Sequence, residues 1–180
     1  MLEKIYIDEP RQTDMNMYRC GIEDCNSGHF WGPAVRDHYI IHYILDGKGI
    51  FTVGDETYTL GKNDGFLICP ETIVYYQADR DDPWSYGWVG FNGFKAAAYL
   101  EQTGLNIDNP IFRYDCDSFL KDCLMRMISA NSLSRGREIR FLGLLYEFLS
   151  QIVEIAAPNP KRRINKKEEY VIKALEYIKM

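Results

Sequence analysis

Residues 37–70 read DHYIIHYILDGKGIFTVGDETYTLGKNDGFLICP, and their pattern indicates the fold class of the chain. Short runs of β-branched and aromatic residues alternate with Gly-containing breaks, which supply the positive φ angles that hairpin turns need. Strands this short and this evenly spaced favour a small antiparallel barrel or sandwich over a parallel α/β sheet. The pattern predicts four strands, at Tyr39–Leu45, Ile50–Val53, Glu56–Leu60 and Gly65–Cys69.

The same β-rich pattern continues on both sides of this segment. Further strands are predicted at Met15–Glu23, Ile73–Ala78 and Trp84–Phe91, so the first half of the chain forms one all-β unit. Residues 24–37 are expected to be a loop, because they contain several turn residues. The aromatic residues Phe30 and Trp31 in this loop are expected to pack under the fold as a lid.

After residue 91 the pattern changes to helices. Asn92–Thr103 is predicted to be a short helix that ends at Gly104. Two longer helices are predicted over residues 117–131 and 138–156, and the second is apolar over more of its circumference than one contact face requires. This excess predicts a homodimer through the helices at 117–156, the alternative being that the barrel and the helix hairpin bury the whole surface.

The C-terminal part of the sequence has a different character. Two prolines and a cluster of basic residues make 158–166 a linker, and the segment that follows, to residue 180, is an amphipathic helix. Because that helical pattern runs to the last residue without a stop signal, we expect the sequence to be cut off at the start of another domain.

Charge and composition restrict the function. The net charge of −5 provides no basic field for nucleic acid, and no run of about 18 apolar residues could span a membrane. The N-terminus carries charges where a secretory signal needs apolar residues, so we expect a cytoplasmic protein with no membrane partner. Five cysteines without a CxxC pair are expected to be reduced, mostly buried thiols.

The sequence does not indicate a metal or catalytic site. His38 and His42 are four residues apart, which in a strand separates them by about 13 Å, too far for two ligands of one ion. Residues 70–75 also lack the Gly and His of the second ligand segment that metal-binding barrels of this kind carry. Motifs for nucleophilic catalysis, phosphate binding and dinucleotide binding are missing as well. We therefore predict no catalytic residue, no metal ligand and no cofactor.

A ligand pocket is better supported by the alternation of side chains along the strands. One face of residues 36–45 carries a mixed polar and apolar set, and one face of the later strands carries aromatic residues. Aromatic rings beside Arg, His and Tyr suit a sugar, because its C–H faces stack on rings and its hydroxyls accept charge-assisted hydrogen bonds. The alternative is an aromatic core with Arg36 in a surface ion pair. The residues that alternation assigns to this interior are Arg36, His38, Ile40, His42 and Ile44, then Val74, Tyr76 and Ala78, then Trp84, Tyr86 and Trp88.

Three motifs together give the sequence a family resemblance. The first is the spacing GHxxGPxxRxxY…H…GKG. The second is the turn pattern GDGFLICP, which reads NDGFLICP at residues 63–70, and the third is YYxAD…PWxYxWxGFxG. Over residues 18–94 the chain resembles the N-terminal regulatory domain of AraC-family transcription regulators, particularly those that govern sugar and oligosaccharide use. The resemblance implies an α+β fold, in which a cupin-like antiparallel β-barrel of the jelly-roll type is followed by a C-terminal helix hairpin.

The resemblance also implies a domain organisation. Residues 1–17 would be an N-terminal arm, 18–94 the effector-binding barrel, 95–157 the helical dimerisation region and 158–166 the linker. Residues 167–180 would be the start of a truncated helix-turn-helix DNA-binding domain. DNA would then be bound only through the missing C-terminal part.

Site residues can be assigned by position from the arabinose-responsive member of the family. Its sugar contacts fall on Glu23, Tyr76, Tyr86 and Trp88, three of which alternation selects independently. A contacting arginine of the family falls on Gly32 here, so the effector need not be arabinose. Arg36, four residues further on, is expected to take over that role, and His42 is an additional candidate.

The sequence thus predicts the effector-sensing and dimerisation domain of a transcription regulator, with a sugar or oligosaccharide as the small-molecule effector, and not an enzyme. Two alternatives stay open at this point. One is a metal-independent cupin enzyme acting on a carbohydrate, and the other is a regulator that senses a non-sugar molecule such as an aromatic acid.

Overall fold

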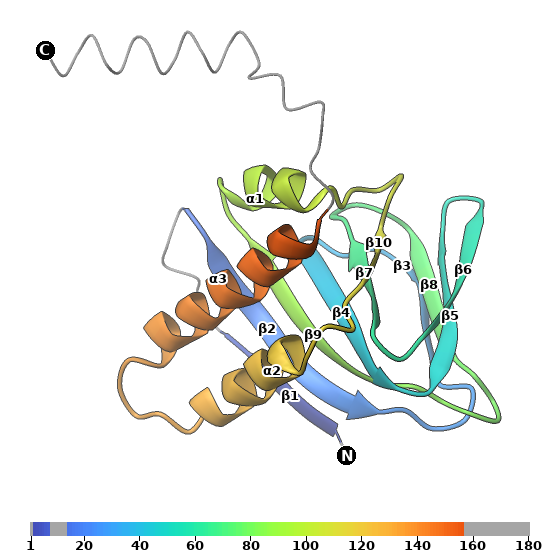
Figure 1. Ribbon diagram of the computed structural model, residues 1–180, viewed down its shortest axis with the longest axis horizontal. Helices are drawn as coiled ribbons and strands as arrows, with labels where there is room; N and C mark the ends of the chain where they lie inside the picture. Colours follow the sequence, from blue (N-terminus) through green and yellow to red (C-terminus); the bar gives the residue numbers. More distant parts are fainter. Residues whose placement is uncertain (1, 8–13, 157–180) are drawn as a thin grey trace, which may run out of the picture.

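The computed structural model describes residues 2–7 and 14–156, which form two antiparallel β-sheets and three helices (Figure 1). The larger sheet has the strand order β1-β2-β9-β4-β7-β10, and the smaller has the order β3-β8-β5-β6. The strands are β1 (Leu2–Tyr6), β2 (Asn16–Asp24), β3 (Phe30–Ala34), β4 (Tyr39–Asp46), β5 (Lys48–Val53), β6 (Glu56–Gly61), β7 (Asp64–Ile68), β8 (Val74–Ala78), β9 (Ser85–Asn92) and β10 (Ile111–Arg113).

The two sheets face each other and enclose an aromatic core. The larger sheet contributes Ile40, Ile44 and Phe66 to this core, and the smaller sheet contributes Phe51 and Val74. Every pairing between the named strands is antiparallel. The predicted α+β fold with a jelly-roll type of antiparallel barrel is therefore confirmed, and the barrel consists of two sheets rather than one continuous ring.

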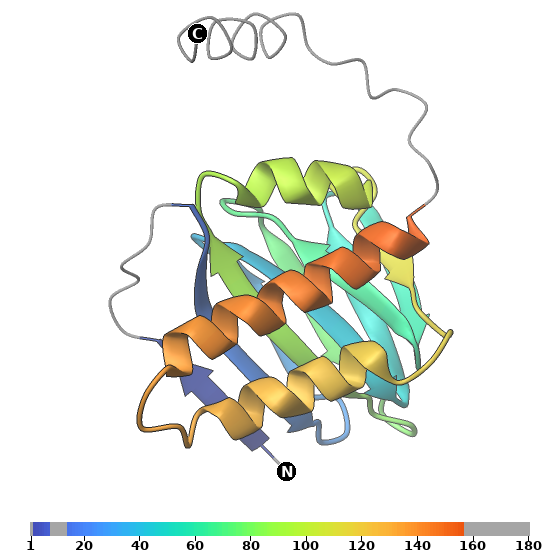
Figure 2. The same cartoon turned by 60° about the vertical axis from the view of Figure 1, so that its left-hand side comes forward.

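The helices cover the opposite face of the larger sheet (Figure 2). α1 (Ala96–Thr103) ends at Gly104, whose φ of 73° allows the left-handed cap that was predicted there. α2 (Phe119–Ala130) and α3 (Arg137–Ile155) form an antiparallel hairpin that packs on β2, β4 and β9. A second core lies at this contact and includes Phe141, Leu145 and Phe148 from α3.

Side chains of β4 alternate between the two cores as predicted. Ile40 and Ile44 point into the core between the sheets, whereas Ile41 and Tyr43 pack under the helices. Both faces of the strand are buried, which explains why β4 reads as a nearly continuous apolar run.

Three strands were not recognised in the sequence. β3 lies in the segment that was predicted to be a loop. The prediction was wrong there because Gly32 and Pro33 interrupt the strand pattern, and the pairing of β3 with β8 is irregular between Trp31 and Ala34. A proline is tolerated there because β3 is an edge strand, where no further strand needs its N–H. β10 is a three-residue edge strand, and β1, in the predicted arm, pairs antiparallel with β2.

The predicted linker 158–166 and the predicted helix 167–180 lie outside the described residues. The domain boundaries at residues 17, 94 and 157 remain predictions. All five cysteines are free; Cys20, Cys25 and Cys123 are buried, Cys69 is half-buried and Cys116 is exposed. In the part of the chain that the structure describes, no helix is both long enough and apolar enough to cross a bilayer.

Candidate functional site

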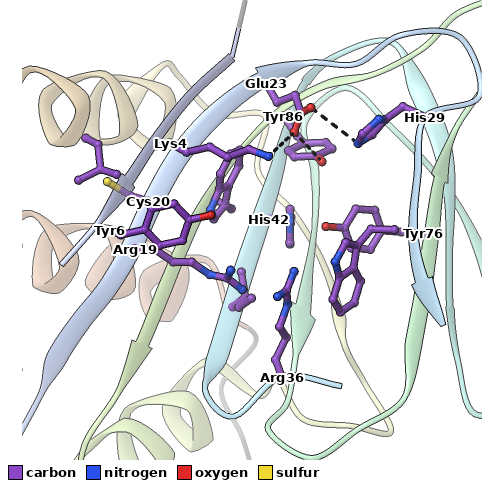
Figure 3. A pocket seen from close by; sticks show the side chains of 14 residues that line it. Lys4, Tyr6, Arg19, Cys20, Glu23, His29, Arg36, His42, Tyr76 and Tyr86 are labelled. Carbon is purple, nitrogen blue, oxygen red and sulfur yellow. Dashed lines mark hydrogen bonds and ion pairs between the residues drawn. The ribbon is translucent and has the colours of Figure 1, made fainter. Parts of the chain in front are cut away.

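A cavity of about 250 Å³ lies between the sheets and under β1 (Figure 3). All six residues predicted for the effector site line it: Glu23, Arg36, His42, Tyr76, Tyr86 and Trp88. The structure thus brings together residues that span more than sixty positions of the sequence. The remaining lining residues are Lys4, Ile5, Tyr6, Arg19, Cys20, His29, Trp31 and Ile40.

β2 supplies one side of the cavity through alternate residues. Arg19 and Glu23 face the cavity, while Ile22 belongs to the core under the helices, and Cys20 belongs to that core and also borders the cavity. Gly21, between the two cavity residues, has no side chain because a Cβ there would overlap the indole of Trp88 and lie 2.5 Å from the backbone oxygen of Glu3. This glycine lets Trp88 lie against the strand.

The base of the cavity is aromatic. His42 stacks on Phe66 with ring centroids 4.5 Å apart and an interplanar angle of 7°, and Tyr86 meets it edge-on at 5.1 Å. Burial, followed by the charges of Arg19 and Arg36, holds the pKa of His42 well below its ordinary value. His42 is therefore a neutral ring at physiological pH.

Two guanidinium groups enter the cavity on one side (Figure 3). Arg36 lies over the Trp31 ring, with its guanidinium carbon 3.9 Å from the ring centroid. Burial, and next the charge of Arg36, lower the pKa of Arg19. The Nε atoms of both arginines, and Nδ1 of His42, are buried and have no hydrogen-bond partner among the described residues.

Glu23 lies on the other side of the cavity, next to His29 (Figure 3). Its Oε2 accepts a hydrogen bond of 3.4 Å from the hydroxyl of Tyr86 and lies 3.8 Å from Nζ of Lys4, and its Oε1 lies 3.7 Å from Nε2 of His29. Burial raises the pKa of Tyr76 to about 12 and also raises the pKa of Tyr86, so both phenols keep their protons. The cavity therefore offers a carboxylate, two neutral hydroxyls and cationic donors around aromatic faces.

Metal-ligating side chains meet at one place beside the cavity, among the residues that the structure describes. They are Glu23, Cys25 and His29, whose ligand atoms lie within 4.8 Å of one another. His38, which the sequence offers as a possible ligand together with His42, stacks on Tyr18, and its Nδ1–H donates a 2.6 Å hydrogen bond to the carboxylate of Asp37. His38 and His42 thus contact different neighbours.

Sequence reasoning missed five polar or aromatic residues of the cavity. Lys4 and Tyr6 lie on β1, which was read as an arm of weak periodicity. His29 and Trp31 were assigned to a packed loop, yet both line the cavity, while Phe30 is 60% exposed. Arg19 could have been found, because it lies four residues before Glu23 on the same strand and therefore on the same face.

The model of the family described as AraC-like ligand binding domain matches residues 16–149. The chain belongs to this family. The matched range contains every described strand except β1, together with α1, α2 and α3 as far as Leu149. The AraC-like domain thus includes all six site residues predicted from the sequence.

Two relatives have known operon assignments. The Msm operon regulatory protein of Streptococcus mutans is 37% identical over 147 residues, which are 78% of this chain and 51% of that protein. The raffinose operon transcriptional regulatory protein RafR of Pediococcus pentosaceus is 40% identical over 93 residues, which are 50% of this chain and 34% of that protein. The AraC-like chain therefore spans about half or less of the length of these relatives.

A solved structure supports the fold independently. Apo ToxT of Vibrio cholerae, in a variant form, superposes with a TM-score of 0.54 at 11% sequence identity, over 91% of this chain and 66% of that one. At this identity the likeness concerns the fold alone.

Proposed function

We propose that this AraC-like domain senses a sugar or oligosaccharide for a transcription regulator of carbohydrate use. The observation that supports this most directly is one cavity in which aromatic faces lie beside buried guanidinium nitrogens without partners. Glu23, Arg36, His42, Tyr76, Tyr86 and Trp88 are the proposed effector-binding residues, and Arg19 joins them.

The chemistry of the cavity fits a carbohydrate. Trp88 and Tyr76 offer faces for the C–H side of a sugar ring, and Arg19 and Arg36 donate to hydroxyl oxygens. Glu23 is an acceptor for hydroxyl protons. The volume of about 250 Å³ is slightly below that of typical ligand pockets, which span about 300–1,000 Å³. We infer that a monosaccharide, or one terminal unit of an oligosaccharide, enters the cavity.

The relatives support the same effector class. One of them is described as regulating a raffinose operon, and raffinose is an oligosaccharide. Regulation of transcription, rather than an enzymatic reaction, is accordingly the role we propose for the whole protein, in the cytoplasm. DNA would be bound by a part of the protein outside the described residues.

A second effector class is favoured by one observation. Arg19 and Arg36 place two positive charges at one side of the cavity, and burial lowers the pKa of Arg19, so its charge would be stabilised by an anion. A non-sugar effector with a carboxylate, such as an aromatic acid, would satisfy both guanidinium groups and stack on the aromatic rings.

We also propose that α2 and α3 form a homodimer. α3 buries one apolar stripe against the sheet, but Ile139 is 75% exposed and Tyr146 is 39% exposed on the other side. Leu142 lies between them and also packs against the core, and the Tyr146 ring meets Tyr99 of α1 edge-on. The three residues follow the i, i+3, i+7 spacing of a second apolar stripe whose most exposed member is Ile139. Such a stripe is self-complementary in a two-fold arrangement of helix hairpins.

Thermal unfolding with a ligand panel tests the effector proposal. The panel contains raffinose, lactose, their monosaccharides, arabinose and a set of aromatic carboxylates. A true effector at one hundred times its dissociation constant adds about 2.7 kcal/mol, which raises Tm by about 5–10 °C for a chain of this size. Arg36→Gln should abolish the shift, and the exposed Arg135→Gln should retain it as the matched control.

The outcomes separate the proposals. A shift only with carboxylates would replace the sugar by the acidic effector. A shift that Arg36→Gln does not reduce, or no shift with any compound, would show that the cavity is not the effector site.

A further inference from the structure

The turn between β2 and β3 brings three different metal-ligating side chains together. Glu23 lies near the end of β2, Cys25 follows at i+2 and is buried, and His29 comes after a tight turn. The N–H of His29 donates a 2.9 Å hydrogen bond to the carbonyl of Asn26, and Gly28 has a φ of 65°. The backbone of the turn therefore places the His29 side chain on the same side as Glu23 and Cys25.

Hydrogen bonds to β8 hold the turn in place. The N–H of Gly28 donates to the carbonyl of Asp79 at 3.3 Å, and the N–H of Ala78 donates to the carbonyl of His29 at 2.8 Å. The side-chain amide of Gln77 donates to the carbonyl of Gly28 at 3.1 Å. His29 is thus held by a turn that is anchored to the smaller sheet, while Glu23 is held on β2 of the larger sheet, so the site is supported from both sides.

The distances fit a shared ion better than a direct contact. Oε1 of Glu23 and Nε2 of His29 are 3.7 Å apart, which is too long for a hydrogen bond. Two ligands at about 2.1 Å from one tetrahedral zinc ion are separated by about 3.4 Å. All three ligand atoms lie within 4.8 Å of one another, so small side-chain rotations would complete the geometry.

The two oxygens of Glu23 have different surroundings. Oε2 is engaged by the Tyr86 hydroxyl and lies near Lys4, whereas Oε1 faces His29. One oxygen can therefore bind an ion while the other keeps its present partners. The half-exposed side chain of His29, at 37%, leaves an entry path for the ion.

We propose that Glu23, Cys25 and His29 bind a divalent metal ion of the zinc class, with its fourth position open to the cavity. One thiolate, one imidazole and one carboxylate are a ligand set that zinc accepts, and three protein ligands leave one coordination position free. Glu23 and His29 also line the cavity, so the free position faces the ligand space. A hydroxyl or carboxylate oxygen of the effector could occupy it.

Binding requires the loss of one proton. Burial raises the pKa of the Cys25 thiol to about 11, so the ion must displace the thiol proton, which passes to solvent. The thiolate then bonds to the metal without any change in oxidation state.

Cobalt spectroscopy tests this proposal directly on the full 180-residue chain. The protein is treated with chelator, kept reduced and titrated with Co²⁺, with Zn²⁺ as competitor. We expect one equivalent per chain, a thiolate-to-cobalt charge-transfer band, and displacement by Zn²⁺. Cys25→Ser should remove the band, and His29→Gln should weaken affinity by about tenfold or more. Cys116→Ser, at an exposed cysteine outside the group, is the matched control and should leave both unchanged.

Three results would overturn the proposal: no stoichiometric binding, a charge-transfer band that survives Cys25→Ser, or a band lost in Cys116→Ser. If Cys25→Ser does not fold, His29→Gln decides, because His29 is half-exposed and its replacement leaves the core intact. The readout contains no sugar. A ligand panel without any thermal shift therefore does not contradict the metal site, and a cobalt titration without binding does not contradict the effector site.

Discussion

The guanidinium carbon of Arg36 lies 3.9 Å from the centroid of the Trp31 ring. The same ring stacks on Tyr76, with centroids 5.5 Å apart. Arg36 and Tyr76 are both proposed effector-binding residues. Trp31 contacts both of them, Arg36 by a cation–π interaction and Tyr76 by ring stacking. Trp31 belongs to β3, an edge strand with an irregular pairing, so the position of Arg36 depends on a short element at the margin of the smaller sheet.

Replacing Trp31 should harm the site more than the fold. Trp31→Ala removes one cation–π contact and one partly exposed ring, which should cost about 0.5–2 kcal/mol of unfolding free energy. Trp84 is completely buried between the sheets, and Trp84→Ala should cost about 3–5 kcal/mol. Urea unfolding of both variants measures the difference. Equal losses would mean that β3 carries the stability of the smaller sheet.

Acid should destabilise the fold through His42. Its folded-state pKa is held well below the ordinary 6.5, so the folded protein binds fewer protons than the unfolded chain. This contribution is fully present well above pH 6.5 and is lost progressively as the pH falls through 6.5 toward the lowered folded-state pKa. The pKa of His38 is also lowered, so it adds a loss of the same sign.

A non-titrating ring isolates the part due to His42. His42→Phe keeps a ring against Phe66 but cannot take up a proton. The difference in unfolding free energy between pH 7.5 and pH 5.5 should therefore be smaller in this variant than in the unchanged protein, as measured with urea. An identical pH dependence in both proteins would show that His42 is not buried as a neutral ring.

Two glycines should respond to alanine in opposite directions. Gly21→Ala places a Cβ on the indole of Trp88 and near the Glu3 carbonyl, and should cost about 1–3 kcal/mol. Gly143 lies within α3 with nothing within 4 Å of an added Cβ, so Gly143→Ala should stabilise the protein by about 0.5–1 kcal/mol. Thermal and urea unfolding give both signs. A neutral Gly21→Ala would mean that Trp88 can move away from β2.

The proposed dimer should depend on the outer stripe of α3. Ile139→Asp puts a charge into the stripe and should shift the protein toward monomers, as measured by sedimentation at micromolar concentration. Ile73→Asp is a matched control, because Ile73 is 65% exposed but lies just before β8, away from the helices. Two variants with the same sedimentation behaviour, or a monomeric parent protein, would contradict the helix-mediated dimer.

The sequence predicted the regular parts of the fold because their side-chain periods are strong. β4 shows the alternation that places Ile40 and Ile41 in different cores, and α3 shows a helical stripe. β3 could not be predicted in this way, since its edge position tolerates Pro33 and its pairing is irregular. Its identity as a strand comes from tertiary contact with β8, which no local pattern records.

The candidate site was predicted in its centre and missed at its edges. Tyr76, Tyr86 and Trp88 followed from strand alternation, and the structure places them around one cavity. Lys4 enters through β1, whose pairing with β2 is a tertiary contact that the weak periodicity of this segment does not indicate. The grouping of Glu23, Cys25 and His29 depends on the path of a turn, so the sequence spacing alone did not reveal it.

β2 is the strand whose two faces serve two different purposes. Arg19 and Glu23 point to the cavity, and Cys20 and Ile22, their immediate neighbours in the chain, pack beneath the helices. If the cavity binds the effector as proposed, mutations that alter recognition and mutations that alter the packing of the helices would fall on alternating codons of one short segment. The two properties can diverge separately during evolution, provided that the segment neither gains nor loses a single residue.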